Sequence, residues 1–364
     1  MEVLLVNIPT FKYRLFGEHI GLGSLAANLR KQGIETAIYD PCFENASLED
    51  IAERIVKCNP PVLGLSIVSH LTINNCITLC ELLASHKFPG YIVLGGHPAT
   101  FLSRELLEKA ENVTAVIKGD ADVTFPLLAN YFLKRNGSPL SKIQNLLLRH
   151  DGNIIETATS HVLPDLDTLP FPSRDSLEAY PELVKPVQIL SSRGCNFGCS
   201  YCDIQSYYDY TNSGNKWIAR SPANVVDEIQ MITERYRKTV FSFNDANFLG
   251  AGELGVQRAH GIADEIVRRR LHVKFAITAR AQGIERELFI HLKDAGLHAV
   301  ILGLESGVDA VLRRYNKGTT VDQNIRAVSI IRDLELYASY GFIYYDYATK
   351  LEDLVENAEF LKKK

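Results

Sequence analysis

Three cysteines stand within eight positions in the segment RGCNFGCSYCD, at Cys195, Cys199 and Cys202. Their CxxxCxxC loop contains no histidine, so these three thiolates alone cannot complete the four-ligand site of a structural zinc ion. A four-iron, four-sulfur cluster ordinarily takes four thiolates, and with three of them one iron keeps a position for a substrate or cofactor. We therefore expect a [4Fe-4S] cluster here. A zinc site completed by a distant ligand, or three free thiols, is the alternative.

The other four cysteines are scattered through the first third of the chain. Seven is an odd number, and the chain shows no export signal, so the sequence does not favour a disulfide framework. Cys76 and Cys80 share one face of a predicted helix with apolar neighbours. We interpret this pair as small core residues rather than as metal ligands.

Polar and charged residues follow three predicted strands in the second half, in the segments FNDANFL, ITARA and LGLESG. Barrel enzymes assemble their sites at the carboxyl ends of strands, and the guanidinium of Arg280 suits a carboxylate or a ribose edge. Asn, Asp and Ser also favour turns and helix caps for local reasons. The candidates at these strand ends are Asn244, Asp245, Arg280, Glu305 and Ser306.

The first 135 or so residues alternate short β-rich apolar runs with amphipathic stretches. This alternation predicts an open, doubly wound α/β domain over residues 1–140, with ligands beyond the carboxyl ends of its parallel strands. The expected strands are 3–8, 35–39, 62–69, 91–96 and 115–119, and the expected helices are 22–31, 48–56, 74–85, 103–110 and 125–134.

Residues 141–185 are predicted as a β-hairpin around Asp151-Gly152 followed by a proline-rich linker. From residue 186 the alternation resumes. Only 179 residues follow position 185, whereas a full eightfold barrel needs about 250, so we expect a partial (β/α) barrel of five to six units over 186–364. Its predicted strands are 187–192, 240–244, 273–278, 299–304 and 339–345, and its predicted helices are 224–237, 255–270, 285–295, 322–334 and 351–361.

The composition is that of an ordinary globular protein, with 46% hydrophobic and 23% charged residues and a net charge of −4. No global positive field would attract nucleic acid or an anionic membrane, so neither is expected as a partner. No apolar run reaches the roughly 18 residues that span a bilayer, and the first residues lack the pattern of a secretory signal. The sequence thus predicts a cytoplasmic location.

The cysteine spacing, directly after the first strand of a βα repeat, resembles the radical S-adenosylmethionine (SAM) superfamily. The resemblance implies that the open iron chelates the amino and carboxylate groups of the methionyl part of SAM. It also implies that loop aromatics shield the cluster, that the acidic strand end faces the SAM amino group and that the LGLESG strand end accepts ribose hydroxyls. The SAM-binding residues expected on this basis are Phe197, Tyr201, Asn244, Asp245, Arg280, Glu305 and Ser306.

The order of an α/β domain, a linker and the barrel motifs looks like the cobalamin-dependent branch of that superfamily, in which a Rossmann-like domain binds cobalamin with its nucleotide tail buried. Ser66 and Val68, followed by Gly95-Gly96, resemble the SxL and GG elements of cobalamin-binding domains. A serine hydroxyl can bond the tail, and paired glycines let it pass close to the backbone. Further residues expected around this pocket are Ser69, His97, Gly119 and Asp120.

The loop that supplies an axial histidine to cobalt in some members is incomplete. His19 stands at the histidine position of GEHIGL, but Gly17 replaces the aspartate that would orient its ring. The default expectation is therefore a cobalt without a protein ligand, with His19 as a weak candidate.

The resemblance implies that the reduced cluster cleaves SAM to a deoxyadenosyl radical, which abstracts hydrogen from the substrate, and that methylcobalamin then delivers a methyl group. A second SAM would remethylate the cobalt. We predict a C-methyltransferase that acts on an unactivated carbon of a small metabolite or natural product and receives electrons from a flavodoxin or ferredoxin. The alternatives are a cyclase or oxidoreductase without methyl transfer, a tRNA methylthiotransferase, and a non-catalytic cofactor- or partner-binding remnant.

Members of this branch commonly continue with a sixth strand and a C-terminal helical region. The resemblance thus predicts a trimmed or short member, or a barrel whose open edge pairs with a second copy, because unpaired strands pair with neighbours.

Overall fold

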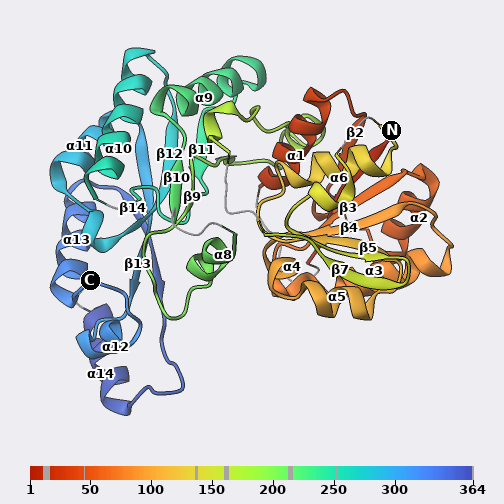
Figure 1. The fold of residues 1–364 in the computed structure, drawn as a ribbon. Coiled ribbons are helices and arrows are strands. Elements are labelled where there is room, and N and C mark those ends of the chain that lie inside the picture. The colour runs from red at the N-terminus through yellow and green to blue at the C-terminus, as the bar shows by residue number, and fades with distance from the viewer. Residues whose placement is uncertain are drawn as a thin grey trace. The chain divides into compact units, whose positions relative to one another are not determined.

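The computed structural model describes residues 1–10, 17–44, 46–135, 138–159, 164–211, 216–250 and 252–362. The chain folds as two compact units (Figure 1). The first contains Met1–Lys185 and the described residues from Tyr207 onward in helix α8 (Ile204–Thr211), and the second contains Pro186–Ser206 and the described residues from 216 onward.

The first unit is built on one seven-stranded sheet with the order β2-β1-β3-β4-β5-β6-β7. The first five strands are parallel, and the last two are antiparallel to their neighbours. The strands are β1 (Val3–Asn7), β2 (Thr36–Tyr39), β3 (Val62–Ser66), β4 (Tyr91–Gly95), β5 (Val113–Ile117), β6 (Leu146–His150) and β7 (Asn153–Glu156). The order 2-1-3 makes the gap between β1 and β3 the switch point of this sheet, where ligands of such folds bind.

The hairpin β6–β7 completes this sheet, whereas the sequence analysis places it in the segment between the domains. Ala115 of β5 pairs with Leu148 of β6 in antiparallel register. The pairing covers the edge of β5. It also buries Leu146, Leu147 and Leu148, so the apolar surface of this run is removed from water.

Helices cover both faces of the first sheet and create two apolar layers, one on each side. Cys76 and Cys80 are both buried in one of these layers, which confirms their interpretation as core residues. The helices are α1 (Ile20–Lys31), α2 (Leu48–Cys58), α3 (Ile73–Ser85), α4 (His97–Phe101), α5 (Ser103–Lys109), α6 (Thr124–Phe132) and α7 (Asp175–Ala179), with short 3₁₀ turns at Pro41–Phe43, His70–Thr72, Leu140–Lys142 and Leu166–Thr168.

The second unit contains a five-stranded parallel sheet with the order β14-β13-β12-β11-β8. The predicted α/β class with a partial barrel is thus confirmed, and the five strands agree with the lower end of the expected five to six units. The strands are β8 (Val187–Ile189), β11 (Val240–Phe243), β12 (Lys274–Arg280), β13 (Leu297–Glu305) and β14 (Tyr337–Phe342). A small antiparallel ribbon, β9 (Ser192–Gly194) with β10 (Trp217–Ala219), follows β8 and is not foreseen by the sequence analysis.

Successive side chains of these strands point alternately to a face of the sheet that helices cover and to a face that is more open. Phe241, Phe275 and Leu302 are fully buried on the covered face, where helices follow each strand (Figure 1). The opposite face carries smaller side chains, and Ile301 on it is 45% exposed. The helices are α9 (Pro222–Tyr236), α10 (Gly252–Arg268), α11 (Arg286–Asp294), α12 (Asp309–Arg314), α13 (Val321–Asp333) and α14 (Leu351–Lys362), with a 3₁₀ turn at Ala281–Gly283.

Among the helices in the described part of the chain, none has the length and apolarity that crossing a bilayer requires.

Candidate functional site

The cysteine loop begins at Gly194, the last residue of β9. Gly194 has a φ of +83°, and a Cβ atom there would lie 2.1 Å from the carbonyl oxygen of Lys216. Only glycine therefore fits this entry to the loop. Cys199 is buried, Cys195 is half-buried and Cys202 is exposed. The amide of Cys202 donates to the carbonyl of Cys199 at 3.1 Å, which closes the second half of the loop as a tight turn.

The donor set fits a polynuclear cluster better than a single metal ion. Within the described ranges, no three His, Cys, Asp or Glu side chains converge on one point at metal-ligand distance. A single zinc ion needs such convergence, but a four-iron cluster binds each thiolate through a different iron atom. Three thiols on one short loop therefore fit a cluster that takes one thiolate at each of three irons.

The segment after α12 holds the cysteine loop in place. The amide of Ser200 donates to the carbonyl of Tyr315 at 2.9 Å, and the side-chain amide of Asn316 donates to the carbonyl of Gly198 at 2.7 Å. The rings of Tyr201 and Tyr315 meet edge to face, with 5.4 Å between their centroids. Two hydrogen bonds and one ring pair thus connect the loop to residues more than 110 positions later in the chain.

Arg280, at the end of β12, contacts the cysteine loop directly. Its Nη1 lies 3.1 Å from Sγ of Cys199, and its guanidinium carbon lies 3.8 Å from the centroid of the Phe197 ring. Its Nη2 donates to the carbonyl of Lys317. Burial raises the pKa of the Cys195 thiol, and the positive charges of Arg280 and Lys317 act against that increase. A buried guanidinium at this place favours the thiolate form that ligates iron.

An ion pair between Lys317 and Glu305 lies beside the loop. Nζ of Lys317 is 2.9 Å from Oε1 of Glu305 and 3.2 Å from the hydroxyl of Tyr201, and the two charged side chains are 4% and 13% exposed. Burial, together with the Glu305 carboxylate, raises the pKa of Tyr201, so its phenol stays protonated. Gly303 leaves room for the pair, since a Cβ atom there would lie 2.6 Å from Oε1 of Glu305.

Glu305 reaches this position through an irregular strand end. Its φ is +62°, in the left-handed region, and the pairing of β13 with β14 shifts register between Gly303 and Glu305. A bulge of this kind re-aims the side chain that follows it. Lys317 is a site residue that the sequence analysis misses, because no spacing or local pattern around it indicates a contact with the cysteine loop.

Asp245 and Asn244, at the end of β11, have different surroundings. Asp245 is buried, and it accepts hydrogen bonds from the amide and hydroxyl of Ser191, at 3.0 and 2.8 Å, and from both groups of Ser192. Burial raises the pKa of Asp245, while Arg258 and the serines act against this. The carboxylate thus holds the link between β8 and β9, and its expected role toward the SAM amino group stays a prediction. Asn244 is exposed at the strand end.

Ser306 is likewise committed to the fold. It is fully buried, and its hydroxyl donates to Oδ1 of Asn357 in α14 at 2.9 Å and accepts from the amide of Val308 at 3.1 Å. The Ser306 hydroxyl is thus engaged by Asn357 and Val308, and its expected role as an acceptor of ribose hydroxyls stays a prediction.

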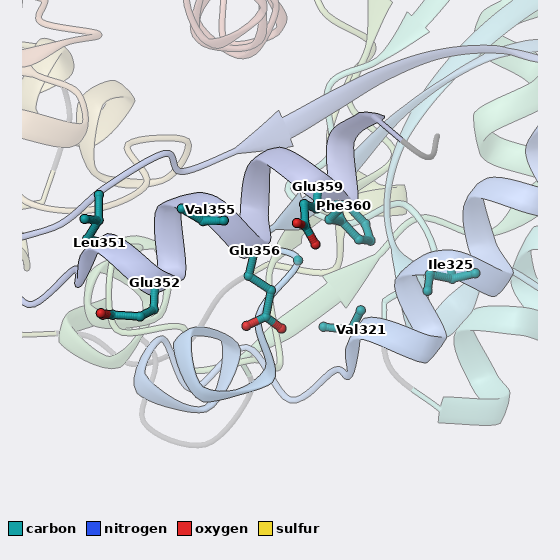
Figure 2. Close-up of a pocket in the computed structure, with 9 residues that line it drawn as sticks. Val321, Ile325, Leu351, Glu352, Val355, Glu356, Glu359 and Phe360 are labelled. Atoms are coloured by element: carbon teal, nitrogen blue, oxygen red, sulfur yellow. The ribbon is translucent and has the colours of Figure 1, made fainter.

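A cavity of about 720 Å³ lies between α13 and α14 (Figure 2). No predicted site residue lines it. Its walls combine apolar side chains with the carboxylates of three glutamates, and the lining residues are Gly307, Val321, Ile325, Leu351, Glu352, Val355, Glu356, Glu359 and Phe360.

In the first unit, His19 and Ser66 meet at the switch point between β1 and β3. His19 caps α1, where its Nδ1 accepts from the amide of Leu22 at 3.1 Å. The ring proton is therefore assigned to Nε2, which donates to the hydroxyl of Ser66 at 2.8 Å. Burial lowers the pKa of His19 to about 4. Both ring nitrogens are engaged, so this arrangement offers cobalt no imidazole lone pair.

Gly95 ends β4 and Gly96 follows it, and the two glycines meet different requirements. Gly96 has a φ of +106°, and a Cβ atom there would lie 2.3 Å from the carbonyl oxygen of Ile67. A Cβ atom on Gly95 would meet nothing within 4 Å. Gly96 thus serves the packing of the backbone, whereas the open space at Gly95 fits a ligand that passes close to it. In the loop after β3, Val68 is 42% exposed, and Ser69 caps the following turn by accepting from the amide of Leu71.

His97 and Asp120 both contact one residue that the sequence analysis misses, and Gly119 precedes Asp120 in the chain. The ring of Tyr207 lies 4.5 Å from that of His97 between centroids, and its hydroxyl lies 3.4 Å from Oδ1 of Asp120. Gly119 has a φ of +77°, and its amide donates to the hydroxyl of Thr100 at 2.9 Å. Tyr207 follows the cysteine loop in sequence but packs within the first unit.

Comparisons with known proteins agree with both halves of this description. Residues 189–361 match the family model of the radical SAM superfamily, and residues 7–129 match that of the B12 binding domain. An uncharacterized methyltransferase of Pyrococcus horikoshii is 25% identical over the whole of this chain and 78% of its own length. The anaerobic magnesium-protoporphyrin IX monomethyl ester cyclase of Cereibacter sphaeroides is 26% identical over 88% of this chain and 52% of its own length.

Among solved structures, the cobalamin-dependent SAM radical enzyme OxsB, with aqua-cobalamin and SAM bound, superposes with a TM-score of 0.85 at 22% identity. The match covers 99% of this chain and 51% of OxsB, so the chain spans about half the length of OxsB and of the cyclase. The two matched families imply a [4Fe-4S] cluster, SAM and cobalamin as cofactors. The chain therefore belongs to the radical SAM superfamily and carries a B12-binding domain ahead of its radical SAM domain.

Proposed function

We propose that this chain is a cobalamin-dependent radical SAM C-methyltransferase that acts on an unactivated carbon of a small metabolite or natural product. The observation that carries the proposal is the presence, on one chain, of a three-cysteine loop held by Arg280 and Asn316 and of a B12-binding domain with open space at Gly95. An unactivated carbon has neither an acidic proton nor a lone pair, so acid–base catalysis cannot alkylate it. When bound, the cluster and SAM supply a radical route and cobalamin supplies the methyl group.

The residues of the protein bind and orient the cofactors, and they exclude water from the site. Cys195, Cys199 and Cys202 would hold the cluster, and Arg280 keeps positive charge at Cys199 while Phe197 covers that side of the loop. Lys317 neutralises Glu305, and that carboxylate still has lone pairs for ribose hydroxyls.

Asn244, exposed at the end of β11, is the proposed partner of the SAM amino group.

In the first unit, Ser66 and Gly95 are the proposed contacts of the cobalamin tail. The hydroxyl of Ser66 already accepts from His19 at 2.8 Å, and it can donate its own proton to a ligand. His97, Gly119 and Asp120 are proposed to line the same pocket, and Val68 and Ser69 lie in the loop that follows Ser66. No protein ligand to cobalt is proposed.

We also propose a flavodoxin or ferredoxin as the one-electron donor, and the cytoplasm as the location, since reduced thiols and a cluster need reducing surroundings. In the described part of the second sheet, β14 pairs with β13 alone. A second copy is proposed to add at this edge. Light scattering that shows a dimer supports this, and a clean monomer contradicts it.

The test uses anaerobically reconstituted protein loaded with hydroxocobalamin and supplied with a reductant, with SAM labelled in its methyl carbon, and with a protein-free extract of cellular small molecules. We expect label in a new product, and no label with the variant in which Cys195, Cys199 and Cys202 are all changed to Ala. Deoxyadenosine formation without label transfer contradicts methyl transfer and favours a cyclase-type reaction, as in the Cereibacter sphaeroides relative. Failure to cleave SAM at all rejects the radical function.

A further inference from the structure

Helix α8 begins two residues after the third cysteine, and two of its tyrosines face the same way. Tyr207 and Tyr210 are three positions apart, a spacing that places side chains on one face of a helix. Tyr207 is 7% exposed. Its ring packs against His97 at 4.5 Å, and its hydroxyl lies 3.4 Å from Oδ1 of Asp120. A segment that the sequence connects to the cluster loop thus packs against residues proposed to line the cobalamin pocket.

Tyr210 contacts a fully buried lysine. Nζ of Lys118 donates to the Tyr210 hydroxyl at 3.1 Å and lies 5.2 Å from the centroid of its ring. The Lys118 side chain is 1% exposed, and its ammonium also pairs with the carboxylate of Glu156. An unpaired buried ammonium is strongly unfavourable, so Glu156 and Tyr210 together stabilise the charge. The lysine in turn holds α8 at this place.

Both tyrosines contact one short segment, Lys118-Gly119-Asp120, directly after β5. The amide of Gly119 connects this segment to Thr100 of α4, the helix that His97 begins. The same backbone therefore carries the contacts of α8 and one wall of the proposed cobalamin pocket. A shift of α8 would move both tyrosines, and it would leave Lys118 with one partner fewer.

We propose that Tyr207 and Tyr210 are positioning residues that couple occupation of the cluster site to the binding of cobalamin. The inference rests on the proposed function. A cluster bound to all three cysteines fixes the end of the loop at Cys202, and the next residues of the chain are the first turn of α8. Without the cluster that end has fewer attachments, so cobalamin binding must order α8 and the 118–120 segment as well. The coupling is reciprocal, so bound cobalamin also retains the cluster.

The test compares the dissociation constant of hydroxocobalamin for cluster-reconstituted and for chelator-treated protein, measured by absorbance titration under anaerobic conditions. In the wild type we expect the cluster to tighten binding by about 5-fold or more, within the usual range of coupling between sites. Tyr207→Ala with Tyr210→Ala is expected to reduce this factor to about 1, while the iron content after reconstitution stays unchanged. Tyr347→Ala, at a fully exposed tyrosine, is the matched control and keeps the wild-type factor.

A conservative pair, Tyr207→Phe with Tyr210→Phe, keeps both rings and loses the hydroxyl contacts with Asp120 and Lys118. It is expected to give an intermediate factor, and it decides the question if the alanine pair does not fold. A second readout is the rate of iron loss to a chelator, which cobalamin should slow in the wild type and in the Tyr347→Ala control but not in the alanine pair.

An equal dissociation constant with and without the cluster in the wild type overturns the coupling alone, and so does an undiminished factor in both tyrosine pairs. A wild-type chain that retains no cobalamin in either form overturns the proposed function as well, which separates the two failures.

Discussion

Replacement of Lys317 by Met is the sharpest perturbation of the cluster site. The change keeps the length of the side chain and removes the charge that faces Glu305 at 2.9 Å. Glu305, which is only 13% exposed, would then lose the cation that compensates its charge. Removal of one partner from a buried pair costs about 3–5 kcal/mol, and we expect about 3 kcal/mol because neither side chain is completely enclosed.

The assay follows urea unfolding through the fluorescence of Trp217, the single tryptophan of the chain, which lies in β10 of the second unit. The protein is measured without a cluster, so that loss of iron does not contribute. With a urea m value of about 3 kcal/mol/M for the second unit, a loss of about 3 kcal/mol lowers the midpoint by about 1 M.

The double variant Lys317→Met with Glu305→Gln completes the comparison. Because the amide is neutral, we expect the double variant to recover about 2 kcal/mol of what the single change loses, which is a coupling energy usual for residues in contact. A midpoint shift below about 0.2 M for Lys317→Met, or strictly additive effects of the two changes, would refute the reasoning that this pair stabilises the site.

Three further predictions concern other residues. Gly95→Ala leaves the melting temperature unchanged but reduces cobalamin retention after desalting, whereas Gly96→Ala destabilises the fold by more than about 1 kcal/mol, because only Gly96 has a left-handed φ. An unstable Gly95→Ala would contradict the first part. The pKa of His19 is lowered to about 4, below its usual value of about 6.5, so calorimetric stability should fall as the pH drops from about 6.5 toward 4. His19→Asn, which keeps a capping acceptor, should flatten that decline. An equal slope of stability against pH in the wild type and the variant contradicts this role of His19. Ser306→Ala should cost about 1 kcal/mol through the lost bond to Asn357 and leave calorimetric SAM affinity unchanged, whereas a tenfold weaker affinity would support the ribose-binding role.

The positions of several site residues follow from local sequence. Arg280 stands at the end of a predicted strand, and the structure brings it to 3.1 Å from Cys199. The carboxyl ends of neighbouring parallel strands meet at one sheet edge, so a strand prediction is enough to bring such residues together. Asp245 and Ser306 stand at equivalent strand ends, yet their side chains bond Ser191, Ser192 and Asn357. A strand end places a residue, but it does not decide which partner the side chain takes.

Local sequence is sufficient to predict the two βα-repeat units, the cysteine triad and the glycine pair, because periodicity, ligand spacing and backbone requirements depend on near neighbours along the chain. The roles of Lys317 and Tyr207, in contrast, depend on long-range packing. Lys317 lies 116 positions from Tyr201, and Tyr207 lies 87 positions from Asp120. Contacts at such separations form only when whole elements pack, because they arise from the burial of charges and rings whose partners have no local pattern.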